Sequence, residues 1–333
     1  MSCWGGKPST PNNDTLQVAC WGRPPLLRHT DFDVKPPTSE DFEIPDTQSS
    51  VFIQVTMLCT IMTSISEVYM QRQHIQQAEL TSIDVALCDW VKSLPDDLKL
   101  YNANGRRLAY YRPVSEMYIQ YFVAIVMSQM LRHKERDRPW RTSIPSRLAA
   151  SCATALYDEI YCREDTVYLL PNHGFFCLAI SLPLLCHRPQ SDLRREMRKS
   201  EIAVIRSVLN SMRDRYGDAS MVLGKMEKLH DTIERSSRSN ESPDATLSEI
   251  QGACIHAKEL FPFPTDFCSD MSLLELVAAT DPDQQAPVTD YPPLPDEHTE
   301  NTLFGYSFVD LFELELPSFN FMEGDESPFT FHA

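Results

Sequence analysis

The feature that most limits the fold of this chain is the uneven distribution of its charge. The 333-residue sequence has a formal net charge of −17 with histidine neutral. Residues 239–333 hold 19 acidic side chains and one basic side chain, Lys258, whereas residues 1–238 hold 28 acidic and 29 basic ones. Because like charges oppose collapse, we expect the packed core to lie mainly in the near-neutral part. A strongly acidic chain is a poor partner for nucleic acid unless its charge is segregated, as it is here.

The near-neutral part is dominated by apolar residues at helical spacing. Between residues 46 and 235 they recur at steps of three and four, which is the period of an amphipathic helix. We expect Ser49 or Ser50 to cap the first helix, and Pro95 to end the second, which starts at Thr81 or Ser82. The apolar stripe of the first helix contains Val51, Val55, Leu58, Met62, Ile65 and Tyr69.

Further helices are expected along the same part of the chain. One spans residues 114–133, and the next begins at Ser143 with Pro145 in its first turn. Residues 173–187 are apolar nearly all round, which predicts a buried helix bent at Pro183. Two amphipathic helices follow over residues 193–216 and 218–235. No segment shows convincing period-2 alternation bounded by turns, so the sequence predicts an all-α body.

The flanks of this body differ from it in composition. Residues 1–45 hold seven prolines and are expected to form an extended lead-in. Residues 262–333 hold nine of the 24 prolines and most of the acidic excess, which is typical of a disordered tail. We therefore divide the chain into a lead-in over 1–45, an all-α domain over 46–261 and an acidic, aromatic tail over 262–333.

Several chemistries lack the residues that they need. Neither glycine spacing of a phosphate-binding loop occurs, and no Gly-x-Ser-x-Gly is present. An all-α isoprenoid synthase would need two facing acidic clusters to hold magnesium, and only Asp96-Asp97 resembles half of one. The longest apolar run in the body, Tyr121–Met127, falls short of the ~20 residues that span a bilayer. The ten cysteines form no Cys-x-x-Cys pair and are interpreted as reduced, small hydrophobic residues.

Two clusters in the body have both a functional and a structural interpretation. His173 and Cys177 lie four residues apart, as two metal ligands on one helix would, but within an apolar helix core packing is favoured. We therefore assign no catalytic, metal or cofactor residues. A basic cluster could contact phosphate or an import receptor, although a solvated helix face is favoured. It consists of Arg194, Arg195, Arg198 and Lys199.

The tail alternates bulky apolar residues with carboxylates between residues 301 and 326. Repulsion among the acids keeps such a chain open, so that an apolar groove with a basic rim can bind its side chains. This is the physics of an acidic transactivation segment. The alternative is a final helix or strand that docks on the body. The residues expected to make the contacts are Phe308, Leu311, Phe312, Leu314, Leu316, Phe319 and Phe321. Residues 266–277 form a second, weaker patch of the same kind.

Two motifs resemble the fungal-specific transcription factor domain, which is the regulatory or middle homology region of binuclear zinc-cluster factors. Gly22-Arg23-Pro24-Pro25-Leu-Leu, followed by the stretch from Asp31 to Phe42, resembles one signature of that family. The run from Leu87 to Leu98, with Trp90, Leu94 and Pro95, resembles its Leu-x-x-Trp-x-x-x-Leu-Pro-x-x-Leu element. The similarity covers roughly residues 20–235. The branch of cutinase-gene regulators is the most similar.

The resemblance implies a nuclear regulator of genes transcribed by RNA polymerase II, such as a fungal metabolic or secondary-metabolite gene set. Family members carry a six-cysteine cluster that binds two zinc ions and reads DNA. This sequence has no such cluster, and we expect the front of the regulatory domain to be missing as well. We therefore expect an incomplete gene product, or a factor that lacks its own DNA reader and needs no cofactor in this chain.

The function expected from the sequence is that of a non-enzymatic transcription activator. Its partners would be coactivators or the general transcription machinery. Homodimers, or heterodimers with a zinc-cluster factor, would bring it to DNA indirectly, and no membrane would be involved. Two alternatives stay open. One is a partner or repressor of a full-length relative that does not itself bind DNA, and the other is an all-α enzyme of unknown class.

Overall fold

The computed structural model describes residues 35–70, 77–132, 142–187, 189, 191–237 and 257–274. Apart from one isolated bridge between Tyr101 and Arg107, the regular structure of these residues is helical, which confirms the all-α prediction. The α-helices are α2 (Thr47–Met70), α3 (Gln77–Ser93), α4 (Arg112–Leu131), α5 (Ile144–Cys162), α6 (Asn172–Cys186), α7 (Asp192–Met212), α8 (Gly217–Ser237) and α10 (Ala257–Leu260). Short 3₁₀ turns cover Ser39–Asp41, Asp96–Leu98 and Asp165–Tyr168.

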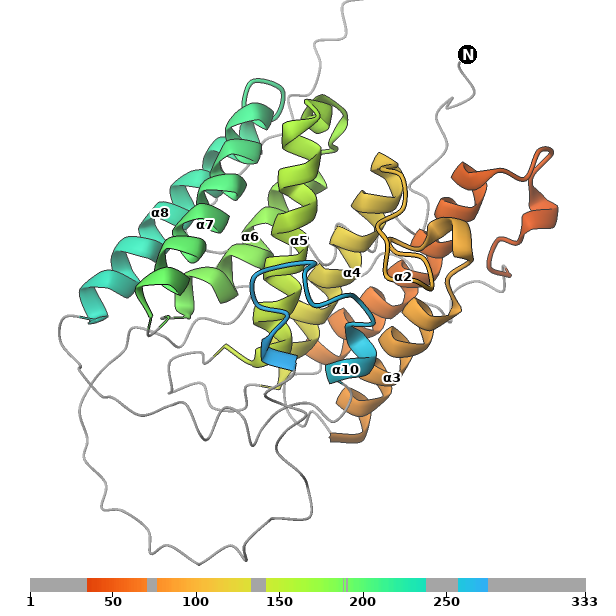
Figure 1. The fold of residues 1–333 in the computed structure, drawn as a ribbon, viewed down its shortest axis with the longest axis horizontal. Coiled ribbons are helices and arrows are strands. Elements are labelled where there is room, and N and C mark those ends of the chain that lie inside the picture. The colour runs from red at the N-terminus through yellow and green to blue at the C-terminus, as the bar shows by residue number, and fades with distance from the viewer. Residues whose placement is uncertain are drawn as a thin grey trace, which may run out of the picture.

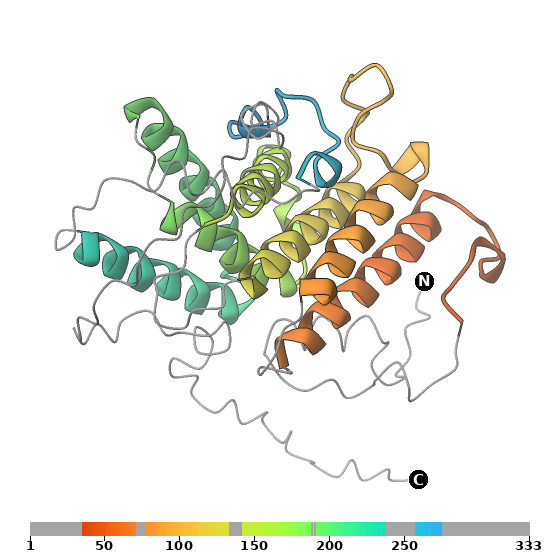
Figure 2. The same cartoon turned by 90° about the horizontal axis from the view of Figure 1, so that it is seen from below.

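The helices form a bundle with α4 and α5 at its centre (Figure 1). α4 packs against α2, α3, α5 and α6, and α5 also packs against α7. α2 and α3 lie at one end of the bundle, and α7 and α8 lie at the other (Figures 1 and 2). Because α4 has neighbours on most of its sides, nearly all of its residues from Val114 to Leu131 are buried.

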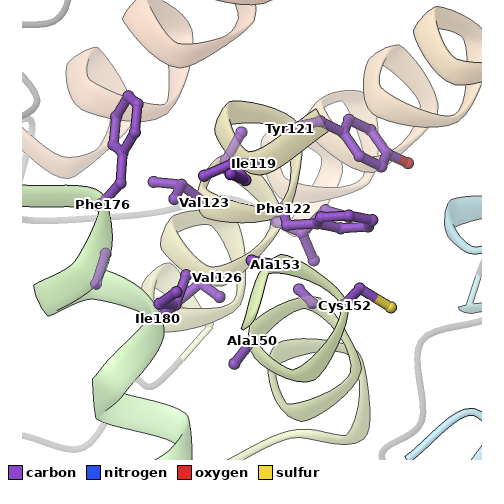
Figure 3. Packing of buried hydrophobic residues seen from close by; sticks show 14 of the residues in the cluster. Ile119, Tyr121, Phe122, Val123, Val126, Ala150, Cys152, Ala153, Phe176 and Ile180 are labelled. Atoms are coloured by element: carbon purple, nitrogen blue, oxygen red, sulfur yellow. The ribbon is translucent and has the colours of Figure 1, made fainter. Parts of the chain in front are cut away.

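Close packing of α4 against α5 depends on small side chains. α5 carries the small residues Ala150 and Ala153, which are both fully buried, and Ala153 lies beside the bulky residues of α4 (Figure 3). Phe122 and Val126 of α4 fill the space that these small residues leave. Each large apolar side chain buried in this way contributes about 1.5–3 kcal/mol to folding.

The structure confirms the start predicted for α5 but not the cap predicted for α2. Ser143 caps α5 by accepting a hydrogen bond from the Ser146 N–H at 3.2 Å, and Pro145 lies in the first turn as predicted. The cap predicted for α2 is wrong, because the helix begins at Thr47. There Asp46 and Ser49 bond reciprocally, each backbone N–H donating to the other side chain at 2.8 Å.

Two further helix predictions can be compared with the structure. α3 begins at Gln77, upstream of the expected start at Thr81 or Ser82, and its first turn ends in Leu80, a buried residue three positions before Ile83 on the apolar stripe. α6 is buried nearly all round, as expected, and contains Pro183. The His187 N–H donates to the Pro183 carbonyl at 3.2 Å and closes the last turn.

One helix in the described part of the chain, over Thr47–Tyr69, is long and apolar enough to cross a membrane by length and composition. It contains no long uninterrupted apolar run, because threonine and serine residues are scattered along it. Those at positions 56, 60 and 64 donate their hydroxyls to the carbonyl four residues earlier, which satisfies them within the helix. Leu58 and Met62 are fully buried in the bundle, and core helices also meet this length criterion.

The boundary expected after residue 261 is wrong. Residues 257–274, which we call the strap, comprise α10 and a run of turns that lies across one side of the bundle (Figures 1 and 2). Phe263, Phe267 and Cys268 pack against the core, and Met271 and Leu274 belong to it. Residues 262–274 are therefore part of the body. The weaker patch over 266–277 is not an open segment as far as Leu274.

Candidate functional site

The Trp and Leu-Pro element joins three helices. Trp90 of α3 is 2% exposed, and its Nε1–H donates to the Gln54 carbonyl of α2 at 3.0 Å. Its ring stacks on Tyr121 of α4, with 5.1 Å between ring centroids and 22° between planes. Leu94 is buried, and α3 ends at Ser93 before Pro95. These residues therefore hold α2, α3 and α4 together.

The aromatic rings beside Trp90 form the surface on which the strap docks. Tyr121 donates its hydroxyl to the Leu260 carbonyl at 2.8 Å, and both residues are fully buried. Phe122 of α4 lies parallel to Phe261, with 6.2 Å between ring centroids, and also contacts the rings of Phe263 and Phe267. Such ring pairs contribute about 0.5–1.5 kcal/mol each beyond the area that they bury. The strap is thus attached through the same helix that holds the Trp element.

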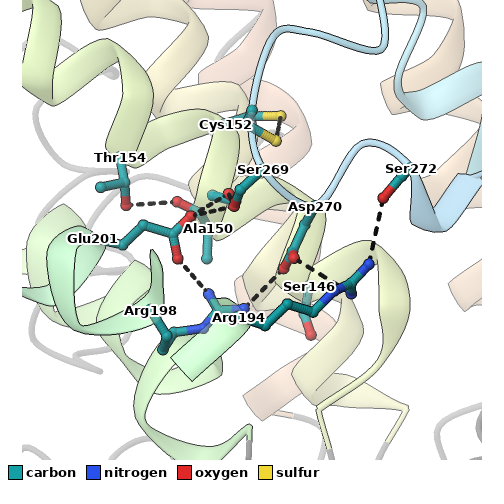
Figure 4. A network of polar contacts seen from close by, with 12 residues as sticks. Ser146, Ala150, Cys152, Thr154, Arg194, Arg198, Glu201, Ser269, Asp270 and Ser272 are labelled. Atoms are coloured by element: carbon teal, nitrogen blue, oxygen red, sulfur yellow. Dashed lines mark hydrogen bonds and ion pairs between the residues drawn. The ribbon is translucent and has the colours of Figure 1, made fainter. Parts of the chain in front are cut away.

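A buried polar network fixes the second half of the strap (Figure 4). Arg198 of α7 donates to Asp270 of the strap and to Glu201, in each case at 2.8 Å. Ser269 donates to Glu201 at 3.0 Å, and Ser151 of α5 donates to the same carboxylate oxygen. We call these five residues the anchor. Only 7% of the Arg198 side chain and 6% of the Asp270 side chain are exposed, so the charges satisfy one another away from water.

The anchor changes the interpretation of the basic cluster on α7. Arg198 faces inward and is engaged by two carboxylates, so it does not belong to a solvated face. Arg194 is half-buried and lies 4.0 Å from an Asp270 oxygen, while it donates to Ser272 at 3.4 Å. Arg195 and Lys199 are exposed, as favoured, and each pairs with an acidic residue three positions earlier in α7. The cluster therefore binds the strap and local acids.

Two thiols meet where the strap crosses α5. The Sγ atoms of Cys152 and Cys268 lie 3.5 Å apart beside the anchor (Figure 4). Cys152 is fully buried, whereas Cys268 is half-buried. A hydrogen bond from the Cys152 thiol lowers the pKa of Cys268, and further bonds from Ser151 and the Asp270 backbone act in the same direction against burial. Burial raises the pKa of the Cys152 thiol, as does its bond to Cys268.

His173 and Cys177 contribute to a second buried network, within the bundle. His173 is 2% exposed, its Nδ1 lies 2.8 Å from the Tyr157 hydroxyl, and its Nε2 lies 3.5 Å from a Glu116 oxygen. Cys177 shares a hydrogen bond with the same tyrosine. Burial raises the pKa of Glu116, but hydrogen bonding and charge from His173, and then Arg112, outweigh it and lower that pKa overall. In the described part of the chain, no group of three or more His, Cys, Asp or Glu residues could hold a metal ion.

The remaining residues singled out from the sequence lie outside the described ranges. These are the first family motif, Gly22, Arg23, Pro24 and Pro25, and the activation segment, Phe308, Leu311, Phe312, Leu314, Leu316, Phe319 and Phe321. Their roles stay predictions. Of the family motif residues, the structure describes Trp90, Leu94 and Pro95.

Sequence reasoning missed the anchor, although α7 contains a signal for it. Arg198 precedes Ile202, Ile205 and Leu209 at steps of four, three and four, so it occupies the apolar stripe of its helix. A charged residue at such a position requires a buried partner of opposite sign. The sequence does not identify that partner, because Asp270 is 72 residues away and has ordinary acidic neighbours.

Comparison of the chain with protein-family models, with curated proteins and with solved structures found no match. The resemblance to the fungal transcription factor domain therefore depends on the quoted motifs. In the structure, the strap binds the bundle at two places, the aromatic surface on α4 and the anchor.

Proposed function

We propose that the protein regulates transcription by RNA polymerase II, with an acidic tail that binds coactivators and a helical body that carries it. The observation that carries this proposal is the composition of residues 275–333, which hold 13 acidic side chains and no basic one. Phe308, Leu311 and Phe312 lie among these acids at the spacing of one helix face. A segment of this kind suits an apolar groove with a basic rim.

The docked strap narrows the region assigned to coactivator binding. The composition of residues 262–274 resembles that of the tail, but their rings pack on α4 and Asp270 pairs with Arg198 of α7. The proposed binding segment therefore begins after Leu274. Leu274, which directly precedes this segment, belongs to the core of the body. This supports a body that carries the tail and a separate segment that recruits coactivators.

DNA contact would come through a partner chain. Residues 1–238 are close to neutral, and the exposed basic residues Arg195 and Lys199 are paired with acids of their own helix. Affinity for duplex DNA grows with the number of phosphates that a protein neutralises, and it falls steeply with salt. We therefore expect the purified chain to bind duplex DNA weakly, without sequence preference, and not at physiological salt. Tight, sequence-specific binding at that salt would contradict indirect recruitment.

The activating role is tested with the full chain fused to a foreign DNA-binding module in a reporter cell. The triple variant Phe308→Ala, Leu311→Ala, Phe312→Ala should lower reporter output by about tenfold, because the loss of ~1.4 kcal/mol of binding free energy has that effect. Tyr291→Ala, an aromatic substitution elsewhere in the same acidic segment, serves as the matched control and should leave output unchanged. An inactive fusion, or equal output from the triple variant, would refute the proposal.

A further inference from the structure

We propose that Cys152 and Cys268 form a reversible disulfide that fastens the strap to α5, with a hydroperoxide as the oxidant and a low-molecular-weight thiol as the reductant. The two Sγ atoms are already in contact at 3.5 Å, and they belong to segments 116 residues apart in the sequence. The bond would therefore convert a non-covalent contact into a cross-link between strap and bundle. This proposal does not depend on the proposed transcriptional function.

The surroundings of the two thiols give them different roles. Cys268 is half-buried on the strap, which lets a small oxidant reach it, whereas Cys152 is fully buried behind it. Hydrogen bonds to the Cys268 sulfur favour its thiolate, and the thiolate is the form that attacks peroxides. Cys152 keeps its proton and lies in contact as the second thiol. This is the arrangement of a reactive cysteine next to a resolving one.

The chemistry balances with one molecule of hydroperoxide. The Cys268 thiol first gives its proton to solvent, and the thiolate attacks the peroxide, so that the O–O bond breaks and the sulfur becomes a sulfenic acid. The alkoxide or hydroxide that leaves takes up a proton from solvent and becomes an alcohol or water. The Cys152 sulfur then attacks the sulfenic sulfur and forms the S–S bond. Its proton departs with the sulfenic hydroxyl group as one molecule of water. Two thiols are thus oxidised by two electrons and the peroxide is reduced, while two equivalents of a small thiol reverse the reaction by exchange.

Other cysteines in the described ranges are less suited to this reaction. Burial raises the pKa of Cys59 to about 11, and it raises the pKa values of Cys177 and Cys186 to about 12, which disfavours their thiolates. Cys162 of α5 is exposed, and its thiol bonds the carboxylate of Asp158 rather than another cysteine. It offers a matched control on the same helix as Cys152.

The neighbouring contacts indicate what the cross-link would do. Ser269 and Asp270 follow Cys268 directly and bind Glu201 and Arg198. A disulfide at Cys268 would keep these partners together even when the ion pairs open. Oxidation therefore stabilises the docked strap, and reduction leaves the strap held by the anchor and the aromatic contacts alone.

The experiment uses the full chain with Cys162→Ser, because trypsin leaves Cys152 and Cys162 on one peptide between Arg147 and Arg163. The reduced protein is treated with hydrogen peroxide, blocked with an alkylating reagent, digested and analysed by mass spectrometry. We expect a linked pair of peptides containing Cys152 and Cys268 that dithiothreitol separates. The same protein with Cys268→Ser should show no link at Cys152. Over-oxidation of Cys268 without a link, or equal linkage to other cysteines, would overturn the proposal.

Urea unfolding of the same samples tests the fastening. Closing a loop of this length should raise the folding equilibrium constant by up to about a thousandfold, and dithiothreitol should remove the gain. The Cys268→Ser variant should show no peroxide-dependent gain, while the protein with Cys162→Ser alone keeps it. A disulfide that forms but leaves the unfolding midpoint unchanged would show that it does not fasten the strap.

Discussion

The substitution Asp270→Asn should loosen the attachment of the strap to the bundle. The substitution keeps the shape of the side chain but removes its charge. The Asp270 carboxylate lies 2.8 Å from Nη2 of Arg198 and 4.0 Å from Nη1 of Arg194. After the change, the Arg198 guanidinium would be buried with only Glu201 to balance it.

The size of the effect follows from the burial of this ion pair. Removal of one partner of a buried pair costs about 3–5 kcal/mol, because the other charge is left uncompensated. Arg198 keeps its bond to Glu201 at 2.8 Å. We therefore expect a smaller loss, of about 2–3 kcal/mol, in the free energy of unfolding. Total stabilities are about 5–15 kcal/mol, so the loss is easy to measure.

Urea unfolding at pH 7, followed by circular dichroism, measures this difference. Asp266→Asn is the matched control, since it makes the same chemical change at an exposed position of the strap. Exposed charges contribute little, so the control should change stability by less than about 0.5 kcal/mol. If Asp270→Asn costs no more than the control, the anchor does not hold the strap and the reasoning is wrong.

Four other substitutions test separate parts of the fold by urea unfolding. Trp90→Phe should cost about 1–3 kcal/mol, because it removes the bond to Gln54 and leaves a small void under Tyr121. Burial, and then three neighbouring arginines, lower the pKa of His187 to about 3. The unfolded chain therefore binds this proton first, so stability should fall as the pH drops from 6.5 towards 3, by at most about 1.4 kcal/mol per unit. His187→Asn should remove that part of the slope, and an unchanged slope would contradict the assignment. Gly105 has a φ of +73°, so Gly105→Ala should cost about 1 kcal/mol. Gly224→Ala, in helix α8 with open space at its Cβ, should instead stabilise by up to about 1 kcal/mol, and effects of the same sign at both glycines would refute this.

The helices could be predicted from the sequence because their periodicity is local. Leu58 and Met62 of α2 recur at helical steps, and Ser143 with Pro145 marks the start of α5. The start of α3 is harder to predict, because Leu80 is the only buried residue of its first turn, residues 77–80. The residue that caps α2 is set by side-chain geometry, which the sequence does not specify, so Asp46 could not be chosen over Ser49 or Ser50.

The strap and its anchor could not be predicted in the same way. The strap has the acidic, Pro-containing composition of the residues after it, so its burial is not visible locally. What binds it is a surface assembled from distant segments, in which Phe122 meets Phe261 and Arg198 meets Asp270. Apolar residues at 263, 267, 271 and 274 do repeat at steps of four and three, but the chain forms turns there rather than a long helix.

The central claim is that residues 257–274 are held on the bundle and that the recruiting segment lies within residues 275–333. Three segments fused to a foreign DNA-binding module in one reporter cell test this directly: residues 262–333, 275–333 and 257–274. We predict equal activation from the first two and none from 257–274, since that segment holds only three acidic side chains and one basic one and lacks the acidic excess of residues 275–333. Activation by 257–274, or silence of 275–333, would contradict the account.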